Sequence, residues 1–391
     1  MSHTSYDFIV IGGGISGVAA AYELTPHGSV LLVERESQLA YHTTGRSAAI
    51  SMESYGNAII RALTVWSTRF LKNVELEFSE TPLWAQRGAL ILADSNSETQ
   101  LDRRIAAIQK LVPSVAKVDD QQLLSLAPYL RQGRWAGGLY EPDAFDLDVH
   151  AIHSAYLAGF RRLGGRVMRD SELMSAQFKH GGWQVDLGKS GTFTTGCLIN
   201  AAGAWADVVA QRCGVATCGI RPLQRTVIMV DPQEDLRHTP YVGTVDEQLF
   251  IKPETTGILV SPCDEVPGEP GDVAPDEMDI AITMDRLLEM TRFSGAKIKT
   301  KWAGQRTFLP DRSPVIGADP QNSRFIWFAA VGGYGIQAGP AMARLVAASA
   351  IGQKLPKDIC GDAFTEFDIS PARYQLTAKI HEELNAVAEL C

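Results

Sequence analysis

A glycine-rich turn between two apolar runs constrains the fold of this chain more than any other feature. The apolar run at residues 8–11 suits a buried parallel strand, and Gly12-Gly13-Gly14-Ile15-Ser16-Gly17 follows it directly. Helix-forming alanine and leucine residues then fill positions 18–24, and a second apolar run, residues 29–33, ends at Glu34. This order predicts a strand–turn–helix–strand unit of a doubly wound α/β sheet.

The spacing of these glycines indicates a binding site for the pyrophosphate of a dinucleotide. Gly12 permits a tight turn, Gly14 leaves room for a phosphate, and Gly17 lets the helix pack closely on the strand. The free N–H groups at the start of the helix favour an anion. Glu34, with Arg35 beside it, is placed to accept hydrogen bonds from a ribose diol. The motif by itself does not separate FAD from NAD.

The pattern of strand, small residues and helix recurs twice. An apolar run at 197–201 precedes Ala202-Gly203 and a helix expected from about Trp205 to residue 212. Another run, 325–331, precedes Gly332-Gly333-Tyr334-Gly335 and a helix of small residues expected from about 336 to 351. Three such units, far apart in the chain, indicate one domain assembled from separated segments.

The intervening stretches alternate short strand candidates with turns. We therefore expect an α/β fold: a Rossmann-like cofactor-binding domain built from separated segments, plus a substrate domain with a mixed, largely antiparallel sheet. The expected cofactor domain comprises residues 1–80, 146–225 and 300–391, and the expected substrate domain comprises residues 81–145 and 226–299. The segment 262–275, rich in proline and acids, is expected to be a loop.

Composition excludes several classes of protein. The chain has 391 residues, 45% hydrophobic and 21% charged, with a net charge of -9, so a nucleic-acid scaffold with a basic face is not expected. No apolar run reaches the roughly 18 residues of a transmembrane helix. The six cysteines form no C-x-x-C pair and no metal-ligand spacing, which favours a reducing compartment and predicts no metal site. We expect a cytoplasmic protein, with peripheral attachment to the inner membrane as an option.

Other candidate groups have plain structural alternatives. The polar loop 41–49 suits wrapping around an extended cofactor, or a solvated surface. Tyr55, Arg225 and Arg306 suit a cavity that holds a carboxylate, yet each also suits a core or surface position. The acids Asp143, Asp146 and Asp148 are expected to cap a following helix, and His150 and His153 are expected on an ordinary face of it.

Five motifs together resemble the D-amino-acid oxidase superfamily of FAD-dependent amine oxidoreductases, and within it bacterial D-arginine dehydrogenase most. The resemblance covers nearly the whole chain. The motifs are DFIVIGGGISG ending at Gly17, YHTTGRSAA at 41–49, NAAGAW ending at Trp205, KWAGQR ending at Arg306, and GGYGIQ ending at Gln337.

The resemblance implies FAD in an extended pose. Glu34 would hold the adenosine ribose, Leu173 would offer backbone contacts to adenine, and residues 333–337 would face the pyrimidine edge of the flavin. Relatives with covalent flavin have a cysteine near Gly304-Gln305, and none is present here, so we expect non-covalent FAD. The full set of expected cofactor contacts is Gly12, Gly14, Ile15, Ser16, Gly17, Glu34, Arg35, Thr44, Gly45, Arg46, Ser47, Ala48, Ala49, Leu173, Ala202, Gly203, Trp205, Gly333, Tyr334, Gly335, Ile336 and Gln337.

The resemblance also implies a substrate site. Arg225 and Arg306 would clamp the substrate carboxylate, Tyr55 would lie near the substrate, and the Gly333 carbonyl would face its amine. Ile50, Met52, Phe250 and Gln337 would line the pocket. The chain departs from the relative in having no acid at Arg87-Gly88-Ala89, Phe250 in place of a tyrosine and Ile50 in place of a histidine. We therefore expect a D-amino acid with a neutral or apolar side chain.

The implied reaction is oxidation of that D-amino acid by hydride transfer from Cα to flavin N5, followed by hydrolysis of the imino acid to a 2-oxo acid and ammonia. No strong base is visible in the sequence, so we expect pocket water to accept the amine proton, helped by a hydrogen bond from the amine to the Gly333 carbonyl. The first alternative is oxidation of a 2-hydroxy acid or of a secondary amine such as sarcosine or proline. The second is a flavin-binding subunit that needs a partner. Oxygen and a quinone both stay open as electron acceptor.

Overall fold

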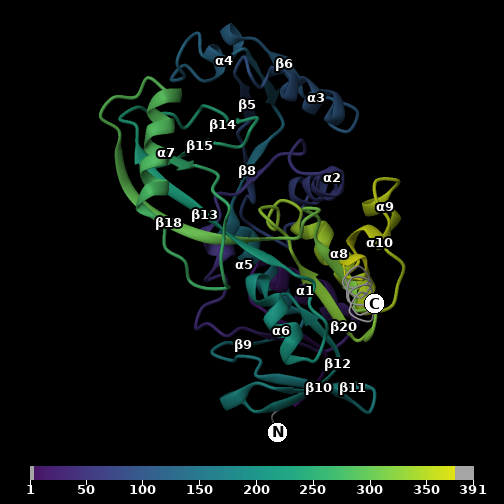
Figure 1. Cartoon of the computed structure of the whole chain (residues 1–391). Helices are drawn as coiled ribbons and strands as arrows, with labels where there is room; N and C mark the ends of the chain where they lie inside the picture. The colour runs from purple at the N-terminus through teal and green to yellow at the C-terminus, as the bar shows by residue number, and fades with distance from the viewer. Residues whose placement is uncertain (1–3, 375–391) are drawn as a thin grey trace, which may run out of the picture.

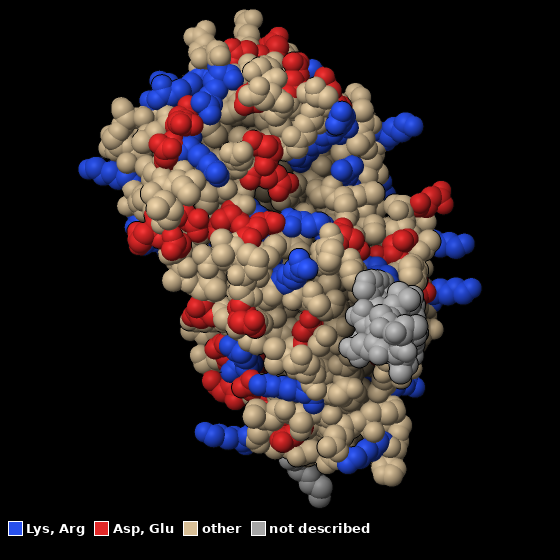
Figure 2. Space-filling view, viewed as in Figure 1, with Lys and Arg blue, Asp and Glu red and all other residues tan. Residues whose placement is uncertain are grey.

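The computed structural model describes residues 4–374; residues 375–391, with Cys391, lie outside the described part. The described chain is elongated, with helices α3, α4 and α7 at one end and strands β10–β12 at the other (Figure 1). On the face shown in Figure 2, acidic and basic side chains are interspersed, without a continuous basic surface.

An eight-stranded sheet forms one end of the molecule. β1 lies between β2 and β12, and all three run parallel, as do β9 beside β2 and β20 beside β12. β10, β11 and β19 add antiparallel edges. The strands are β1 (Ser5–Ile11), β2 (Val30–Val33), β9 (Arg166–Met168), β10 (Ser175–Lys179), β11 (Gly182–Asp186), β12 (Thr192–Asn200), β19 (Val315–Ala318) and β20 (Phe325–Ala329).

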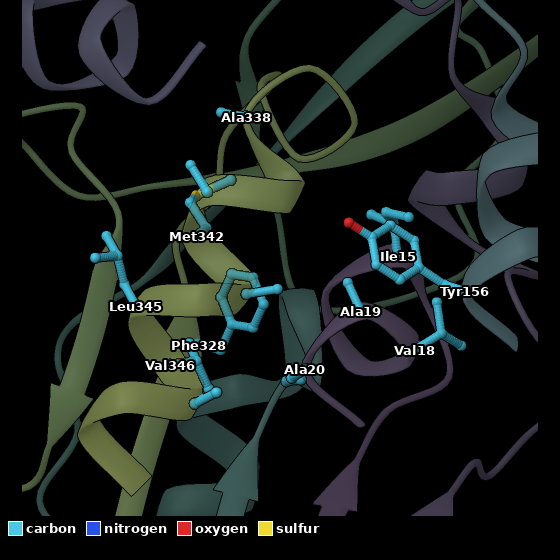
Figure 3. Close-up of a cluster of buried hydrophobic side chains, with 14 of the residues drawn as sticks. Ile15, Val18, Ala19, Ala20, Tyr156, Phe328, Ala338, Met342, Leu345 and Val346 are labelled. Atoms are coloured by element: carbon cyan, nitrogen blue, oxygen red, sulfur yellow. The ribbon is translucent and has the colours of Figure 1, made fainter. Parts of the chain in front are cut away.

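Helices cover both faces of this sheet, because its central strands are apolar on both sides. Phe8 and Val10 pack with helices α1 (Ile15–Leu24), α2 (Ala58–Lys72), α5 (Val149–Arg162) and α8 (Gly339–Ala350). Figure 3 shows side chains of α1, α5 and α8 in this layer around Phe328. Ile9 and Ile11 point to the other face and pack with α6 (Ala206–Arg212).

A nine-stranded sheet, mostly antiparallel, forms the other end. Its longest strands are β13 and β18, which pair with each other over their whole length. The strands are β5 (Ala89–Ala93), β6 (Ala116–Val118), β7 (Gly137–Glu141), β13 (Arg221–Asp231), β14 (Tyr241–Thr244), β15 (Phe250–Glu254), β16 (Gly257–Ser261), β17 (Val266–Pro267) and β18 (Lys297–Phe308).

Three helices cover the nine-stranded sheet. Leu90 and Leu92 of β5 face α4 (Asp120–Leu126) and α7 (Glu277–Met290), and Ile91 faces α3 (Glu98–Ile108). A small sheet joins the two ends. The remaining elements are β3 (Ile50–Ser51), β4 (Trp84–Gln86), β8 (Phe145–Leu147), α9 (Lys357–Cys360), α10 (Glu366–Ile369) and the 3-10 turns η1 (Thr25–His27), η2 (Thr43–Arg46), η3 (Gly188–Ser190) and η4 (Gly203–Trp205).

The expected α/β fold class is confirmed: a doubly wound sheet assembled from separated segments stands beside a mixed, largely antiparallel one. The division at 225/226 falls within β13, and the division at 299/300 falls within β18. These strands carry the chain from one end of the molecule to the other, so the domain boundaries stay a prediction.

Local details differ from the sequence-based expectations. α1 begins at Ile15 rather than 18, and α8 begins at Gly339 rather than 336. The expected loop 262–275 contains the short strand β17. Of the three acids before α5, only Asp148 caps the helix, by accepting from the Ala151 N–H at 2.8 Å. The prediction was wrong for Asp146, which lies in β8 and pairs with Arg87, because a strand separates it from the helix.

Candidate active site

An elongated cavity lies where the parallel strands β1, β2 and β12 end. Ile11, Val33 and Ala201, at these carboxyl ends, all line it. Ligands of open α/β sheets bind at this edge, where strand order reverses. Of the residues expected to contact the cofactor, those lining the cavity are Gly12, Gly14, Ile15, Ser16, Glu34, Arg35, Thr44, Arg46, Ser47, Ala48, Leu173, Ala202, Gly203, Trp205, Gly333, Gly335 and Ile336.

The glycine loop lets backbone approach backbone. Gly12 has a φ of +110°, and a Cβ there would lie 2.4 Å from the Ala201 carbonyl oxygen. A Cβ at Gly17 would lie 1.7 Å from the Gly12 carbonyl oxygen, so Gly17 serves helix–strand packing and does not line the cavity. The Ile15 N–H at the start of α1 donates to Thr44 Oγ1 at 3.1 Å, which brings the polar loop against the helix terminus.

Charged and aromatic side chains surround the end of the cavity near Glu34. The Glu34 carboxylate accepts from the Gly13 and Glu36 N–H groups at 2.7 and 2.8 Å, which fixes it at the glycine loop. The Arg35 guanidinium lies 4.1 Å from the centroid of the Trp205 ring. These planar and acidic groups suit a ribose and a base.

Sequence reasoning missed two residues at this end. The His153 Nε2 lies 3.0 Å from the Gly13 carbonyl oxygen; because a carbonyl only accepts, Nε2 carries a proton, and burial lowers the pKa of this histidine. His153 lies on a face of α5 as expected, but that face is buried against the glycine loop, a contact that the sequence did not indicate. Arg212 donates to the Leu173 carbonyl at 2.6 Å and lines the cavity. No local pattern around either residue signals these long-range contacts.

The loop 41–49 joins the two ends of the molecule. Thr43 Oγ1 donates to the Gln305 carbonyl of β18 at 2.6 Å. Arg46 binds Asp272 and donates to the Ala303 carbonyl at 2.9 Å, so its charge already has a protein partner. A Cβ at Gly45 would lie 2.4 Å from the Ala40 carbonyl oxygen, and Gly45 lines neither this cavity nor the next.

The opposite end of the cavity is formed by the second glycine turn and by β18. A Cβ at Gly333 would lie 2.7 Å from the Arg306 Cζ, so only glycine leaves the Arg306 guanidinium in place. Tyr334 is buried against Tyr55, with ring centroids 5.2 Å apart, and lines neither cavity. The cavity thus runs from the end near Glu34 past a helix N-terminus to a glycine-lined end, and these residues fit an extended dinucleotide such as FAD.

A second cavity adjoins the first at this end. Both are lined by Ser47, Ala48, Arg225, Phe250, Arg306, Gly333 and Ile336. The second cavity alone is lined by Ala49, Ile50, Met52, Tyr55, Ile91, Arg104, Tyr241, Gly243, Thr244, Glu247, Leu249, Cys263 and Gln337. All residues expected around the substrate therefore lie together, next to the glycine-lined end of the cofactor cavity.

The two arginines at the junction have free hydrogen-bond donors. Arg225 is 6% exposed, and its Nη2 donates to Glu265 at 3.2 Å, but its buried Nε has no partner. Within residues 4–374 the Arg306 guanidinium makes no hydrogen bond. β13 and β18 place them on neighbouring strands, since Arg306 pairs with Leu223 and Arg225 with Gly304. Two nearby guanidinium groups with unused donors suit a carboxylate.

Two phenols and a thiol in the second cavity are held in their neutral forms. Burial raises the pKa of the Tyr55 and Tyr241 phenols and of the Cys263 thiol, so all three are protonated at neutral pH. Gln337 donates to Thr64 at 3.0 Å. Among the described residues that line this cavity, Glu247 supplies the carboxylate, and it lies exposed in the turn between β14 and β15.

The sequence analysis did not identify two charged residues of this cavity. Arg104 comes from α3, and Glu247 comes from a turn in which it has a φ of +55°. Neither belongs to a motif, and only the tertiary fold brings both to Arg225 and Arg306. The pocket is apolar at Ile50, Met52 and Phe250, as expected, but it also has charged residues.

Comparisons with known proteins identify the family of the chain. Residues 7–349 match the family model described as "DAO: FAD dependent oxidoreductase". Mouse (Mus musculus) mitochondrial dimethylglycine dehydrogenase is 23% identical over 84% of this chain, which spans only 40% of that protein's length. Glycine oxidase of Bacillus licheniformis is 25% identical over 89% of this chain and 93% of its own. The structure of L-proline dehydrogenase from P. horikoshii superposes with a TM-score of 0.84 at 20% identity, covering 96% of this chain and 99% of that one.

Within residues 4–374, none of the helices has the length and hydropathy to span a membrane.

Proposed function

The chain belongs to the DAO family of FAD-dependent oxidoreductases, and from this premise we propose that it oxidises the amine of an amino acid whose carboxylate is held by Arg225 and Arg306. The observation that supports the proposal is the junction of the two cavities. There, two guanidinium groups with unused donors lie beside the glycine-lined end of the cofactor cavity.

The protein's own residues orient and desolvate the substrate. Arg225 and Arg306 would fix the carboxylate, so that the Cα–H bond of the substrate is directed toward the cofactor cavity, which is an orientation effect. When bound, FAD supplies the oxidant, which takes up a hydride equivalent. The substrate loses that hydride from Cα and a proton from its nitrogen, and water converts the resulting imine to a 2-oxo acid and an amine or ammonia.

The amine proton has few protein acceptors. Tyr55, Tyr241 and Cys263 are protonated at neutral pH and are therefore poor bases. The Gly333 carbonyl would accept a hydrogen bond from the amine, and pocket water would carry the proton away. This predicts that substrate amine ionisation, rather than a protein base, governs the pH dependence of kcat/KM.

Two substrate classes have support. A D-amino acid with an apolar group next to Cα is the first candidate, because Ile50, Met52 and Phe250 line the cavity beside the arginines. A secondary amine is the second, because relatives are named for sarcosine and proline. We further propose that FAD is bound without a covalent link, since no cysteine lines the cofactor cavity among the described residues.

An anaerobic visible spectrum tests this function. The purified holoprotein is mixed in turn with D- and L-amino acids, sarcosine, proline and 2-hydroxy acids. Bleaching of the flavin bands by an amine class, with an equivalent of 2-oxo acid, supports the proposal. Bleaching only by 2-hydroxy acids would contradict amine oxidation. A yellow protein that none of these compounds bleaches would instead indicate a subunit that needs a partner.

A further inference from the structure

The part of the substrate cavity away from the cofactor has a cation that the proposed chemistry does not use. Arg104 lines the substrate cavity but not the cofactor cavity, so it lies beyond the shared residues Arg225, Arg306 and Gly333. It projects from α3, and its side chain is half-buried. Within residues 4–374, Arg104 has no ion-pair partner and no side-chain hydrogen bond.

A second arginine lies close behind it. Arg61 of α2 is also half-buried, and its Nε donates to the Gly56 carbonyl at 2.9 Å, with no acid paired to it in the described chain. Burial lowers the pKa of Arg61, and the nearby charge of Arg104 lowers it further. The two helices therefore bring like charges together, and within residues 4–374 neither arginine has an ion-pair partner. An anion bound at Arg104 would relieve both the repulsion and the unmet hydrogen bonding.

The carboxylate of Glu247 offsets the charge of these arginines only in part. Glu247 also lines this cavity, but it is exposed, so water and salt screen its charge more than that of the half-buried arginines. Ile50, Met52 and Ile91 add apolar side chains to the wall. The cavity thus combines the cations Arg225 and Arg306 next to the cofactor cavity, the cation Arg104 away from it, and an apolar wall.

We propose that Arg104, supported by Arg61, binds a second carboxylate of the substrate, so that the preferred substrates are dicarboxylic amines. The second carboxylate would be on the side chain, separated from Cα by methylene groups, or on the nitrogen substituent. This inference rests on the proposed function and refines the apolar pocket expected from sequence: the apolar wall contacts the methylene groups, and Arg104 binds the terminal acid.

Matched substrates test the proposal. Both enantiomers of glutamate and of glutamine are offered to the holoprotein, and iminodiacetate is compared with its monoamide. Each pair has the same shape and differs by one charge. We expect kcat/KM to favour the acid about 10-fold or more, in line with a hydrogen-bonded ion pair. The variant Arg104→Met should remove this preference, while turnover of the neutral partner changes little.

Two controls isolate the role of Arg104. Arg103, the exposed neighbour on the same helix, does not line the cavity, so Arg103→Met should keep the preference. Glu247→Gln should strengthen it. A preference for the neutral partner, or an acid preference that survives in Arg104→Met, would overturn the proposal. Turnover of glutamine with no preference for glutamate overturns this inference alone, whereas failure of every amine to bleach the flavin overturns the proposed function.

A binding measurement gives a readout apart from turnover. Glutarate carries two carboxylates and no amine, and butyrate is its matched monocarboxylate. Glutarate should raise the Tm of the holoprotein more than butyrate does, and this difference should vanish in Arg104→Met with an unaltered flavin spectrum. Equal shifts by both compounds in the unmodified protein would contradict a second carboxylate site.

Discussion

The two arginines at the junction of the two cavities differ in the hydrogen-bond partners of their guanidinium groups. Arg306 has no hydrogen-bond partner on its guanidinium within residues 4–374, while Arg225 is tied to Glu265 by one nitrogen. Both would contact the substrate carboxylate, but Arg306 is confined mainly by packing against Gly333.

Removal of either guanidinium should impair substrate binding more than cofactor content. For Arg225→Met and Arg306→Met we expect kcat/KM to fall. The fall should correspond to a loss of about 2–5 kcal/mol of transition-state stabilisation, because a buried charged hydrogen bond is lost. Steady-state kinetics and the ratio of flavin to protein absorbance measure both effects. Arg221→Met, an exposed arginine on the same strand, is the matched control. Unchanged kinetics in both cavity variants would remove the carboxylate clamp from the mechanism.

Glu265 is a positioning residue for Arg225. Arg312 holds the Glu265 carboxylate with two hydrogen bonds of 2.6 and 2.8 Å, and this contact lowers the pKa of Glu265 below its usual range. The carboxylate therefore stays ionised at neutral pH beside Arg225, whose Nε is left without a protein partner.

We expect Glu265→Gln to raise KM several-fold with little change in kcat, since the guanidinium loses its fixed partner but the reacting atoms are untouched. Glu265→Asp should recover part of the effect. The change should also disappear in an Arg225→Met background, which a double-mutant cycle measures. A lower KM in Glu265→Gln would mean that Glu265 repels the substrate rather than orienting the arginine.

The residues that sequence could identify share one property: their roles depend on local backbone geometry. The glycine loop, Glu34 and the second glycine turn were placed by motif alone. Glu265 and His153 make side-chain contacts to segments far away in the chain, and Arg104 reaches the cavity only through the tertiary fold. Such placements leave no pattern around the residue itself.

At the level of elements, the segment that carries Met52 and Tyr55 is anchored from the other sheet. Glu141, at the end of β7, is 1% exposed, and its carboxylate accepts from the Glu53 and Ser54 N–H groups at 2.7 and 3.3 Å. This anchor sets the position of one wall of the substrate cavity.

Glu141→Gln should loosen this wall, because an amide NH2 leaves one backbone N–H without an acceptor, at a cost of about 1–3 kcal/mol. Tm should fall and KM should rise, with the flavin content preserved. Thermal melts and kinetics measure these effects. An equal Tm and KM would show that the two backbone contacts do not hold the segment.

The same carboxyl gives a pH signature. Burial raises the pKa of Glu141 above its ordinary value near 4.5. Its contribution to stability is therefore fully present below pH 4.5 and is lost as pH rises through the raised folded-state pKa. The measured quantity is the free energy of unfolding of the wild type minus that of Glu141→Gln. As pH rises from 4.5 through the raised pKa, this difference should fall, and above the raised pKa it should level off. A difference that does not vary with pH would contradict the raised pKa.

Element type was more predictable than element ends. The strands and helices of the three strand–turn–helix units follow from apolar runs and glycine turns. Their ends shifted where turns compete with helix: residues 336–338 extend the glycine turn rather than starting α8, and Asp146 pairs in a strand instead of capping α5.

On the scale of the whole molecule, the order of the strands in the sheets could not be predicted. β13 and β18 run from one end of the molecule toward the other, so neither strand belongs to one expected domain alone. Alternating apolar patterns identified strands in the second half of the chain, but they do not specify partners, and β14 pairs with β5 from 150 residues earlier. The two cavities meet at Arg225 and Arg306 because β13 and β18, which carry these residues, are paired in the sheet.

FAD should stabilise the whole molecule, because its cavity is lined by segments from all three parts of the chain expected to form the cofactor domain. At FAD concentrations of about 100 and 1,000 times Kd, mass action adds about 2.7 and 4.1 kcal/mol to the free energy of unfolding. The Tm of protein stripped of flavin should therefore rise steadily with added FAD. FMN, which lacks the adenosine part, should raise it less. A Tm that does not respond to FAD would contradict a reversibly bound cofactor.

The parallel pairing of β12 with β20 has a consequence for biosynthesis. When the ribosome has released only the first 300 residues, the glycine loop and Glu34 are present, but β20, the turn 332–336 and the helix that covers them are not. The central sheet then exposes an apolar edge and face, and the cofactor cavity lacks the wall formed by residues 304–307 and by the turn 331–336. The central sheet is therefore completed only by the last quarter of the chain, and we expect the nascent chain to be most prone to aggregation at this stage.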